Sequence, residues 1–165
     1  MLAMNQTSRR GLAGLFIALA AQVLSAQATP PVALADVQGL KCNFTLMAIG
    51  NWEKNVPAAE VTKANLTMEF ADIDTQDGTA NAVNVSSSSA GAPHITVRLL
   101  ADNLHFMAMN TSGSVYLTTV FSDKESRSGG NFKAVHTRHE FTPVRLTGWT
   151  SRPEQYYGHC EVVKK

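Results

Sequence analysis

The chain has 165 residues, of which 44% are hydrophobic, 16% charged and 7% aromatic. This composition is typical of one globular domain and excludes a disordered or collagen-like chain. The formal net charge of +1 provides no basic surface of the size that phosphate neutralisation requires, so we expect no nucleic-acid partner.

The first 28 residues have the features of a secretory signal peptide. Arg9 and Arg10 supply positive charge, residues 11–24 are almost wholly apolar, and residues 26–28 read Ala-Gln-Ala, a pattern that signal peptidase recognises. A membrane anchor is the alternative, but the apolar stretch is shorter than the ~20 residues of a spanning helix. The paired arginines are also compatible with twin-arginine export. We therefore expect a periplasmic or extracellular protein without a membrane span in its mature chain.

The sequence contains two cysteines, Cys42 and Cys160. In an oxidising compartment they are expected to form a disulfide, and two cysteines allow only one pairing. The bond would join the two ends of the domain. Neither cysteine lies in a Cys-x-x-Cys motif, so we expect no reactive thiol.

Short segments with β-strand patterns follow the leader, most of them with alternating apolar and polar residues. Turn-forming pairs such as Asp77-Gly78 and Gly129-Gly130 separate them. We expect a flexible segment over 29–38 and a single β domain over 39–165, in which 56–63 forms at most one or two helical turns. The predicted strands cover 40–46, 66–70, 95–99, 104–109, 115–121, 132–141 and 156–163.

About eight hairpin-linked strands and a disulfide between the first and the last predict an all-β fold. We expect an antiparallel up-and-down β-barrel of calycin-like shape. A two-sheet β-sandwich is the alternative, because a disulfide also bridges facing sheets in that architecture. Residues 50–52, Gly-Asn-Trp, resemble the Gly-x-Trp of lipocalins and avidin-like barrels, but they follow a strand-like segment, and we assign no family.

One predicted ligand site involves methionines. Residues 104–109 are apolar on both faces and include Met107 and Met109. In a barrel these side chains and Met68 could line a lumen, where flexible methionines suit an adaptable pocket. Plain core packing is the alternative.

The densest ionisable cluster is residues 136–140, His-Thr-Arg-His-Glu. Residues three apart on a strand point to opposite faces, so His136 and His139 are not expected to ligate one ion, and we predict no metal site. His136 shares a face with Arg138, and we add both to the predicted ligand site together with Tyr157. A hydrogen-bonded structural cluster is the alternative.

Two further segments have specific expectations. Tyr156 and Tyr157 should point to opposite faces of a strand, one into the core and one outward. Residues 72–78 resemble a calcium loop, but Val83 stands where the last ligand should be, so we expect an acidic hairpin turn.

The sequence thus predicts a secreted or periplasmic binding protein without catalytic activity or cofactor. It would hold a small apolar or amphipathic molecule in the barrel, or a secreted protein partner at one barrel end. One alternative is a small secreted hydrolase or isomerase that uses His136 or His139 with Arg138, Glu140 and a tyrosine, although no known catalytic motif is present. Another is an envelope-associated structural protein.

Overall fold

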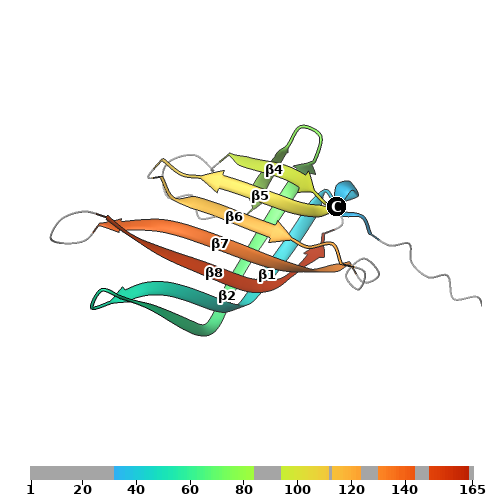
Figure 1. Ribbon diagram of the computed structural model, residues 1–165. Helices are drawn as coiled ribbons and strands as arrows, with labels where there is room; N and C mark the ends of the chain where they lie inside the picture. Colours follow the sequence, from blue (N-terminus) through green and yellow to red (C-terminus); the bar gives the residue numbers. More distant parts are fainter. Residues whose placement is uncertain (1–31, 84–93, 112, 124–129, 144–148, 164–165) are drawn as a thin grey trace, which may run out of the picture.

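The computed structural model describes residues 32–83, 94–111, 113–123, 130–143 and 149–163, and the expected signal peptide lies outside them. Eight antiparallel strands form one closed ring in chain order, with β1 paired to both β2 and β8 (Figure 1). The predicted all-β barrel is therefore confirmed. The elements are η1 (Leu34–Asp36), β1 (Gly39–Glu53), β2 (Val56–Asp74), β3 (Thr79–Val83), β4 (Ile95–Leu100), β5 (Asn103–Met109), β6 (Val115–Val120), β7 (Asn131–Pro143) and β8 (Trp149–Val162).

The disulfide between Cys42 and Cys160 lies at the junction that closes the ring. The two residues are direct partners in the β1–β8 ladder, with their Cα atoms 3.9 Å apart, and both are fully buried. The predicted pairing is confirmed, and it joins adjacent strands instead of facing sheets.

A β-bulge in β1 changes which side chains point inward. Between Phe44 and Leu46 the register shifts relative to both β2 and β8. From Leu40 to Phe44 the buried positions of β1 are therefore even-numbered, whereas beyond the bulge the buried residue is Ile49. A shift of one residue exchanges the two faces of a strand, so the bulge decides what β1 contributes to the interior.

The structure corrects the expectation for residues 56–63, which belong to the 19-residue strand β2 and not to a helical turn. Lys54 and Asn55 have φ values of 50° and 66°, which suit a tight hairpin between β1 and β2. The second half of β1 then supplies ladder partners for this segment. Pairing with a neighbouring strand outweighs the weak local preference.

The β2–β3 connection confirms the predicted acidic hairpin turn. The Asp74 carboxylate oxygen Oδ1 accepts hydrogen bonds from the backbone N–H groups of Gln76 and Asp77, each at 2.8 Å. Gly78 ends the turn with a φ of 71°. Strand β3 follows it and had not been predicted from the sequence.

The barrel has two different ends. At the end where β1 begins, which we call the η1 end, Leu34 and Val37 are buried against the core, although they belong to the expected N-terminal segment. At the opposite end, the hairpin end, the β1–β2 hairpin and strands β7 and β8 extend beyond β4–β6 (Figure 1). Aromatic and aliphatic side chains fill the interior toward the η1 end, including Leu40, Phe44, Phe70, Leu104, Phe106, Val120 and Phe132.

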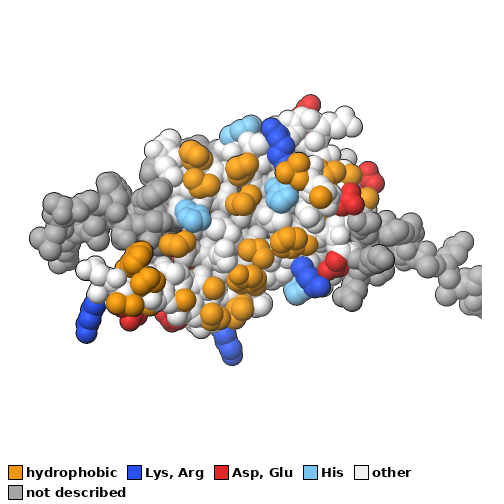
Figure 2. Space-filling model, viewed as in Figure 1, with side chains coloured by type: hydrophobic (Ala, Val, Ile, Leu, Met, Phe, Trp, Pro, Cys, Tyr) orange, Lys and Arg blue, Asp and Glu red, His pale blue; other side chains and the backbone are white. Residues whose placement is uncertain are grey.

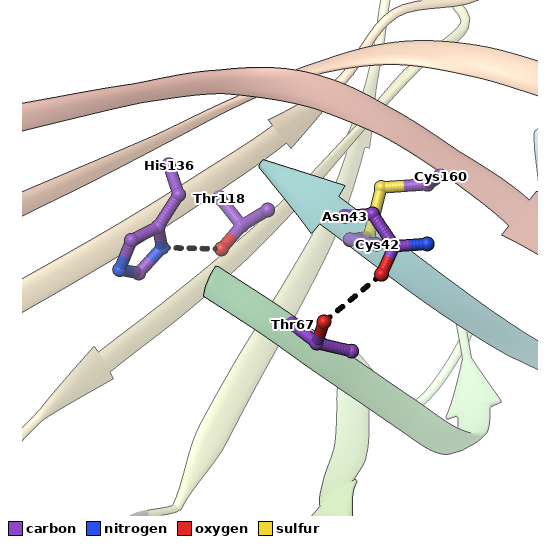
Figure 3. The surroundings of a disulfide bond; sticks show 6 residues. All are labelled: Cys42, Asn43, Thr67, Thr118, His136 and Cys160. Carbon is purple, nitrogen blue, oxygen red and sulfur yellow. Dashed lines mark hydrogen bonds between the residues drawn. A yellow bond between two sulfur atoms is a disulfide. The ribbon is translucent and has the colours of Figure 1, made fainter. Parts of the chain in front are cut away.

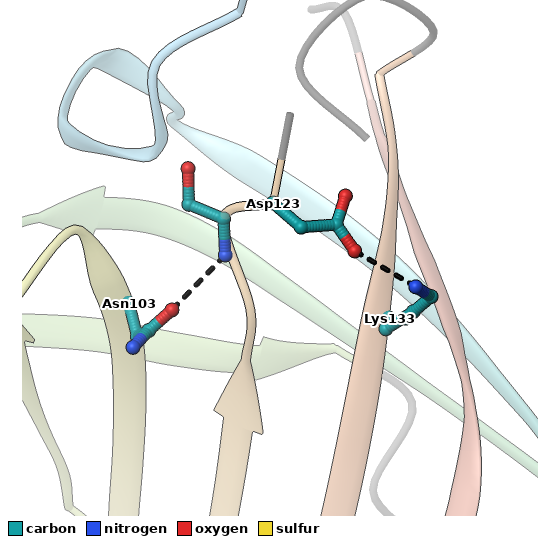
Figure 4. A network of polar contacts seen from close by, with 4 residues as sticks. Asn103, Asp123 and Lys133 are labelled. Carbon is teal, nitrogen blue, oxygen red and sulfur yellow. Dashed lines mark hydrogen bonds and ion pairs between the residues drawn. The ribbon is translucent and has the colours of Figure 1, made fainter. Parts of the chain in front are cut away.

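Polar contacts fasten the strands at the η1 end (Figure 4). The backbone N–H of Ser122 donates to Asn103 Oδ1 at 3.0 Å, and Lys133 pairs with Asp123 at 3.0 Å. A half-open cavity of about 140 Å³ lies beside η1, between Leu34 and the β4–β5 turn at Asp102.

Candidate functional site

The inner faces of β6, β7 and β8 carry two adjacent rows of polar and aromatic side chains. In the first row Thr118, His136 and Tyr156 are direct ladder partners across the three strands. In the second row, two residues along each strand toward the hairpin end, Tyr116, Arg138 and Glu154 are ladder partners in the same way. We call the six residues the polar wall: Tyr116, Thr118, His136, Arg138, Glu154 and Tyr156.

The first row is built around His136. Its Nδ1 forms a 2.8 Å hydrogen bond with Thr118 Oγ1 (Figure 3). The imidazole lies nearly parallel to the Tyr116 ring and is tilted against Phe44 and Tyr156, with centroid distances of 5.9–6.4 Å. His136 is thus enclosed by three aromatic rings, and 3% of its surface is exposed.

This enclosure sets the charge of His136. The pKa of His136 falls from 6.5 to about 4. The main cause of this fall is burial in an apolar, aromatic environment, and the nearby Arg138 guanidinium adds to it. The imidazole is therefore neutral at physiological pH. It acts in the barrel as a hydrogen-bonding group and not as a cation.

The second row contains an ion pair between Arg138 Nη2 and Glu154 Oε2, 2.6 Å apart. The Tyr156 hydroxyl donates to the same carboxylate oxygen at 2.7 Å, which links the two rows. The guanidinium carbon of Arg138 lies 5.8 Å from the centroid of the Tyr156 ring. Solvent reaches 33% of the Arg138 side chain but only 11% of the Glu154 side chain, so the arginine is the more accessible member of the pair.

Small apolar side chains lie on the inner faces of strands outside the polar wall, and one of them, Ala108, is the direct ladder partner of Tyr116. Ala64 on β2, Ala82 on β3 and Ala108 on β5 pack against the core but are only partly buried, and we call them the alanine wall. Short side chains project little into a barrel interior, which leaves more space than long ones. The inner face of the barrel therefore carries polar side chains on β6, β7 and β8 and small apolar ones on β2, β3 and β5.

The structure places three of the predicted ligand-site residues toward the interior but brings only two of them together. His136 and Arg138 are neighbours on the inner face, as the alternation predicted, and Met68 packs against the core as the ladder partner of Cys42. The side chain of Glu140, which was considered for a catalytic role, lies outside the described side chains.

The other three predicted site residues point away from the interior. Met107 and Met109 are 44% and 65% exposed because Leu104 and Phe106 occupy the inward positions of β5, and alternation places residues 107 and 109 outside. Of the tyrosine pair, Tyr156 is buried and Tyr157 is 40% exposed, which confirms that they face opposite ways. Tyr156 therefore takes the place beside His136 that we had expected for Tyr157.

Sequence reasoning missed three members of the polar wall. Tyr116 and Thr118 lie in a segment that was correctly predicted as a strand, but alternation alone does not say which face is inside. Glu154 precedes the start of the strand that we predicted at residue 156. The signal that could have found all three is their ladder partnership with His136 and Arg138, which requires the register.

Two features are absent from the described part of the chain. No three His, Cys, Asp or Glu side chains gather there in a way that could hold a metal ion. None of its helices has the length and apolar character needed to cross a membrane.

Comparison with known proteins gives no relative: no family model matches the chain, and no curated protein does so at a significant level. Function has to be inferred from the polar wall and its surroundings.

Proposed function

We propose that this chain is an exported, non-catalytic binding protein that receives a small amphipathic molecule in the half of its barrel nearest the hairpin end. The observation that carries the proposal is the presence of the polar wall and the alanine wall on the same inner face of the barrel, where Ala108 adjoins Tyr116. Pockets of this kind combine apolar surface with a few directed polar groups. The buried disulfide fits an exported protein.

The side chains that fill the barrel toward the η1 end limit where such a ligand could bind. The rings of Phe70 and Phe106 stack with their centroids 4.0 Å apart in the filled part of the interior, and Phe44 and Phe132 are almost fully buried. An eight-stranded barrel has room for side chains or for one small ligand. A ligand would therefore bind on the side of these rings that faces the hairpin end.

Of the apolar and amphipathic ligands that the sequence predicts, the chemistry of the two walls supports the amphipathic one. A guanidinium has five N–H donors, and the solvent-accessible part of Arg138 can donate to a carboxylate, sulfonate or carbonyl group. The Tyr116 ring lies beside it on β6. The alanine wall would contact the apolar part of the same molecule.

A catalytic role is less well supported. The hydroxyl–imidazole pair of Thr118 and His136 has the distance of a nucleophile and its base. However, these residues are only 2% and 3% exposed, so a substrate could not reach them without local opening. The burial supports a structural hydrogen bond.

The test is a titration with the amphipathic fluorescent anion 1-anilinonaphthalene-8-sulfonate, together with native mass spectrometry of the gently purified protein. We expect stoichiometric binding in the wild type and a loss of at least ~10-fold in affinity for Ala108→Leu, which fills the alanine wall. Ala59→Leu makes the same change at an exposed position of β2 and should bind normally. Equal binding by both variants, or no binding by the wild type, would refute the proposal.

A protein partner at the hairpin end is the second candidate. Trp52 and Val56 lie at the tip of the β1–β2 hairpin and are 66% and 63% exposed. Exposed tryptophans are common anchors of protein interfaces. A partner captured from host or competitor secretions by the wild type, and lost with Trp52→Ser but not with Ala108→Leu, would favour this candidate.

A further inference from the structure

Among the described side chains, a broad region on the outer surface of the barrel holds no Lys, Arg, Asp or Glu. It covers the outward positions in the middle of β5, β6, β7, β8 and the adjoining part of β1, and we call it the uncharged face. Its apolar members are spread over all five strands and include Leu46, Val135, Tyr157, Leu117, Met107 and Met109.

Ladder pairing shows that this surface is continuous. Leu46 is the partner of Tyr157, and Tyr157 is the partner of Val135. In the next row, Met107 pairs with Leu117 across β5 and β6. Directly opposed side chains on one face of a sheet are close enough to touch, and diagonal neighbours are within reach of long ones. The positions between them hold Thr, Ala, Gln, Pro and His.

Charged side chains lie around this region and not within it. Lys63 on β2 is the ladder partner of Leu46, and Arg98 on β4 is the partner of His105. Lys133 precedes Val135 by two residues on β7 and pairs with Asp123. Figure 2 shows the same arrangement, with hydrophobic side chains across the centre of this view and Lys, Arg, Asp and Glu near its margins.

The size of the region is in the range of a protein interface. About fourteen outward positions, each about 4.8 Å by about 6.7 Å on a sheet, cover about 450 Å². Side chains that stand up from the sheet add accessible area, so two such regions together bury roughly the 1,000 Å² that a specific interface needs. Met107 and Met109 at one side and Tyr157 at the other are well exposed and free to pack.

We infer that the uncharged face is the interface of a symmetric homodimer, in which it packs against the same face of a second copy of this chain. In a two-fold dimer each patch must be complementary to itself. A surface without formal charge meets this condition, because packing it on its own copy brings no like charges together and leaves no buried charge unpaired. A partner with a charged surface would lose hydration here without compensation. The dimer does not depend on a ligand in the barrel.

The experiment is sedimentation equilibrium of the protein purified after export, over a range of concentrations. We expect a mass twice that of the monomer for the wild type. Met107→Glu and Met109→Glu each place a carboxylate in the uncharged face at an exposed position, and each should weaken association by at least ~10-fold. Leu100→Glu is the matched control, since Leu100 is 59% exposed but lies beside the β4–β5 turn, outside the face.

Circular dichroism and thermal unfolding of the diluted variants establish that each substitution leaves the fold intact. A wild type that stays monomeric at the highest concentration overturns the inference, and so does a dimer that both methionine variants preserve. A monomer that instead binds another protein or detergent through this face, with loss in the same variants, also overturns it and identifies a different occupant.

Discussion

At the scale of single residues, neighbouring side chains on one strand have opposite surroundings. The Tyr156 hydroxyl donates to the buried Glu154 carboxylate, whereas the Tyr157 hydroxyl donates to Gln155 at 2.8 Å on the exposed side. A hydrogen bond to a buried charged group contributes more to stability than an exposed bond that water can replace. The same substitution at these two positions therefore isolates the effect of the interior.

We expect Tyr156→Phe to lower the free energy of unfolding by about 1–2 kcal/mol, because Glu154 loses one of its donors in a site where water does not replace it easily. Tyr157→Phe serves as the control and should change it by less than about 0.5 kcal/mol. Urea unfolding of both variants measures the difference. Equal losses would mean that the hydroxyl inside the barrel is solvated.

His136 should make stability depend on pH. Its pKa is about 4 in the folded protein and 6.5 when unfolded, so the unfolded chain binds a proton more readily between these values. The contribution of neutral His136 to the free energy of unfolding is full above pH 6.5. It decreases as the pH falls toward 4, and it does not change further below that pH. The decrease amounts to about 3 kcal/mol.

The measurement is urea unfolding at pH 7 and at pH 4.5, in the wild type and in His136→Gln. Carboxylates titrate in the same range, so the difference between the two proteins is the informative quantity. We expect His136→Gln to have the weaker pH dependence, and His159→Gln, at an exposed position of β8, to behave like the wild type. Parallel curves for all three proteins would contradict the burial of a neutral imidazole.

At the scale of elements, the bulge in β1 depends on a glycine in β8, the strand beside it in the sheet. Gly158 is the ladder partner of Phe44, where the register shifts. A Cβ atom at Gly158 would clash with the Asn43 carbonyl oxygen and would lie 2.6 Å from Phe44 Cα, and both are backbone atoms that cannot rotate away. The close approach of β8 to β1 therefore requires glycine at this position.

We expect Gly158→Ala to destabilise the protein by about 3 kcal/mol or more, since either β1 or β8 would have to move. Gly50→Ala in β1 is the control. The nearest atom to a Cβ at this position would be Pro153 Cγ on β8, at 3.7 Å, which is an ordinary contact. Its effect should stay within about 1 kcal/mol. Thermal or urea unfolding distinguishes them, and a Gly158→Ala protein as stable as Gly50→Ala would show that the bulge can relax.

At the scale of the whole molecule, the ring is closed by contacts between the two ends of the chain. The cysteines are 118 residues apart in sequence but adjacent in the sheet. Crosslinking such a distant pair restricts the unfolded chain, and the loop-entropy relation gives about 5 kcal/mol. That value is comparable with the entire stability of many small domains.

Replacing Cys42 and Cys160 together by alanine should therefore lower the free energy of unfolding by several kcal/mol, measured in urea against the oxidised wild type. Both side chains are buried, so the reduced wild type is the better control for packing and should be similarly destabilised. A loss below about 1 kcal/mol would mean that the terminal strands remain associated in the unfolded chain.

Much of the barrel could be predicted from local pattern. Alternation identified most strands, and the single cysteine pair indicated that the first and last strands are neighbours. The joint orientation of His136 and Arg138 also followed from spacing alone, because positions two apart on a strand share a face. These properties depend on residues that are close in sequence or, for the disulfide, on a unique pairing.

What only the tertiary structure decided is which face of each strand is inside. Period-two alternation separates the two faces of a strand but does not say which one is inside. Residues 104–109 are apolar on both faces, so alternation gives no preference there, and Met107 and Met109 were expected inside. The register across β6, β7 and β8 places Thr118 and Tyr156 beside His136 and Glu154 beside Arg138. The physical reason is that ladder pairing and bulges join residues far apart in the chain, and no local preference encodes that register.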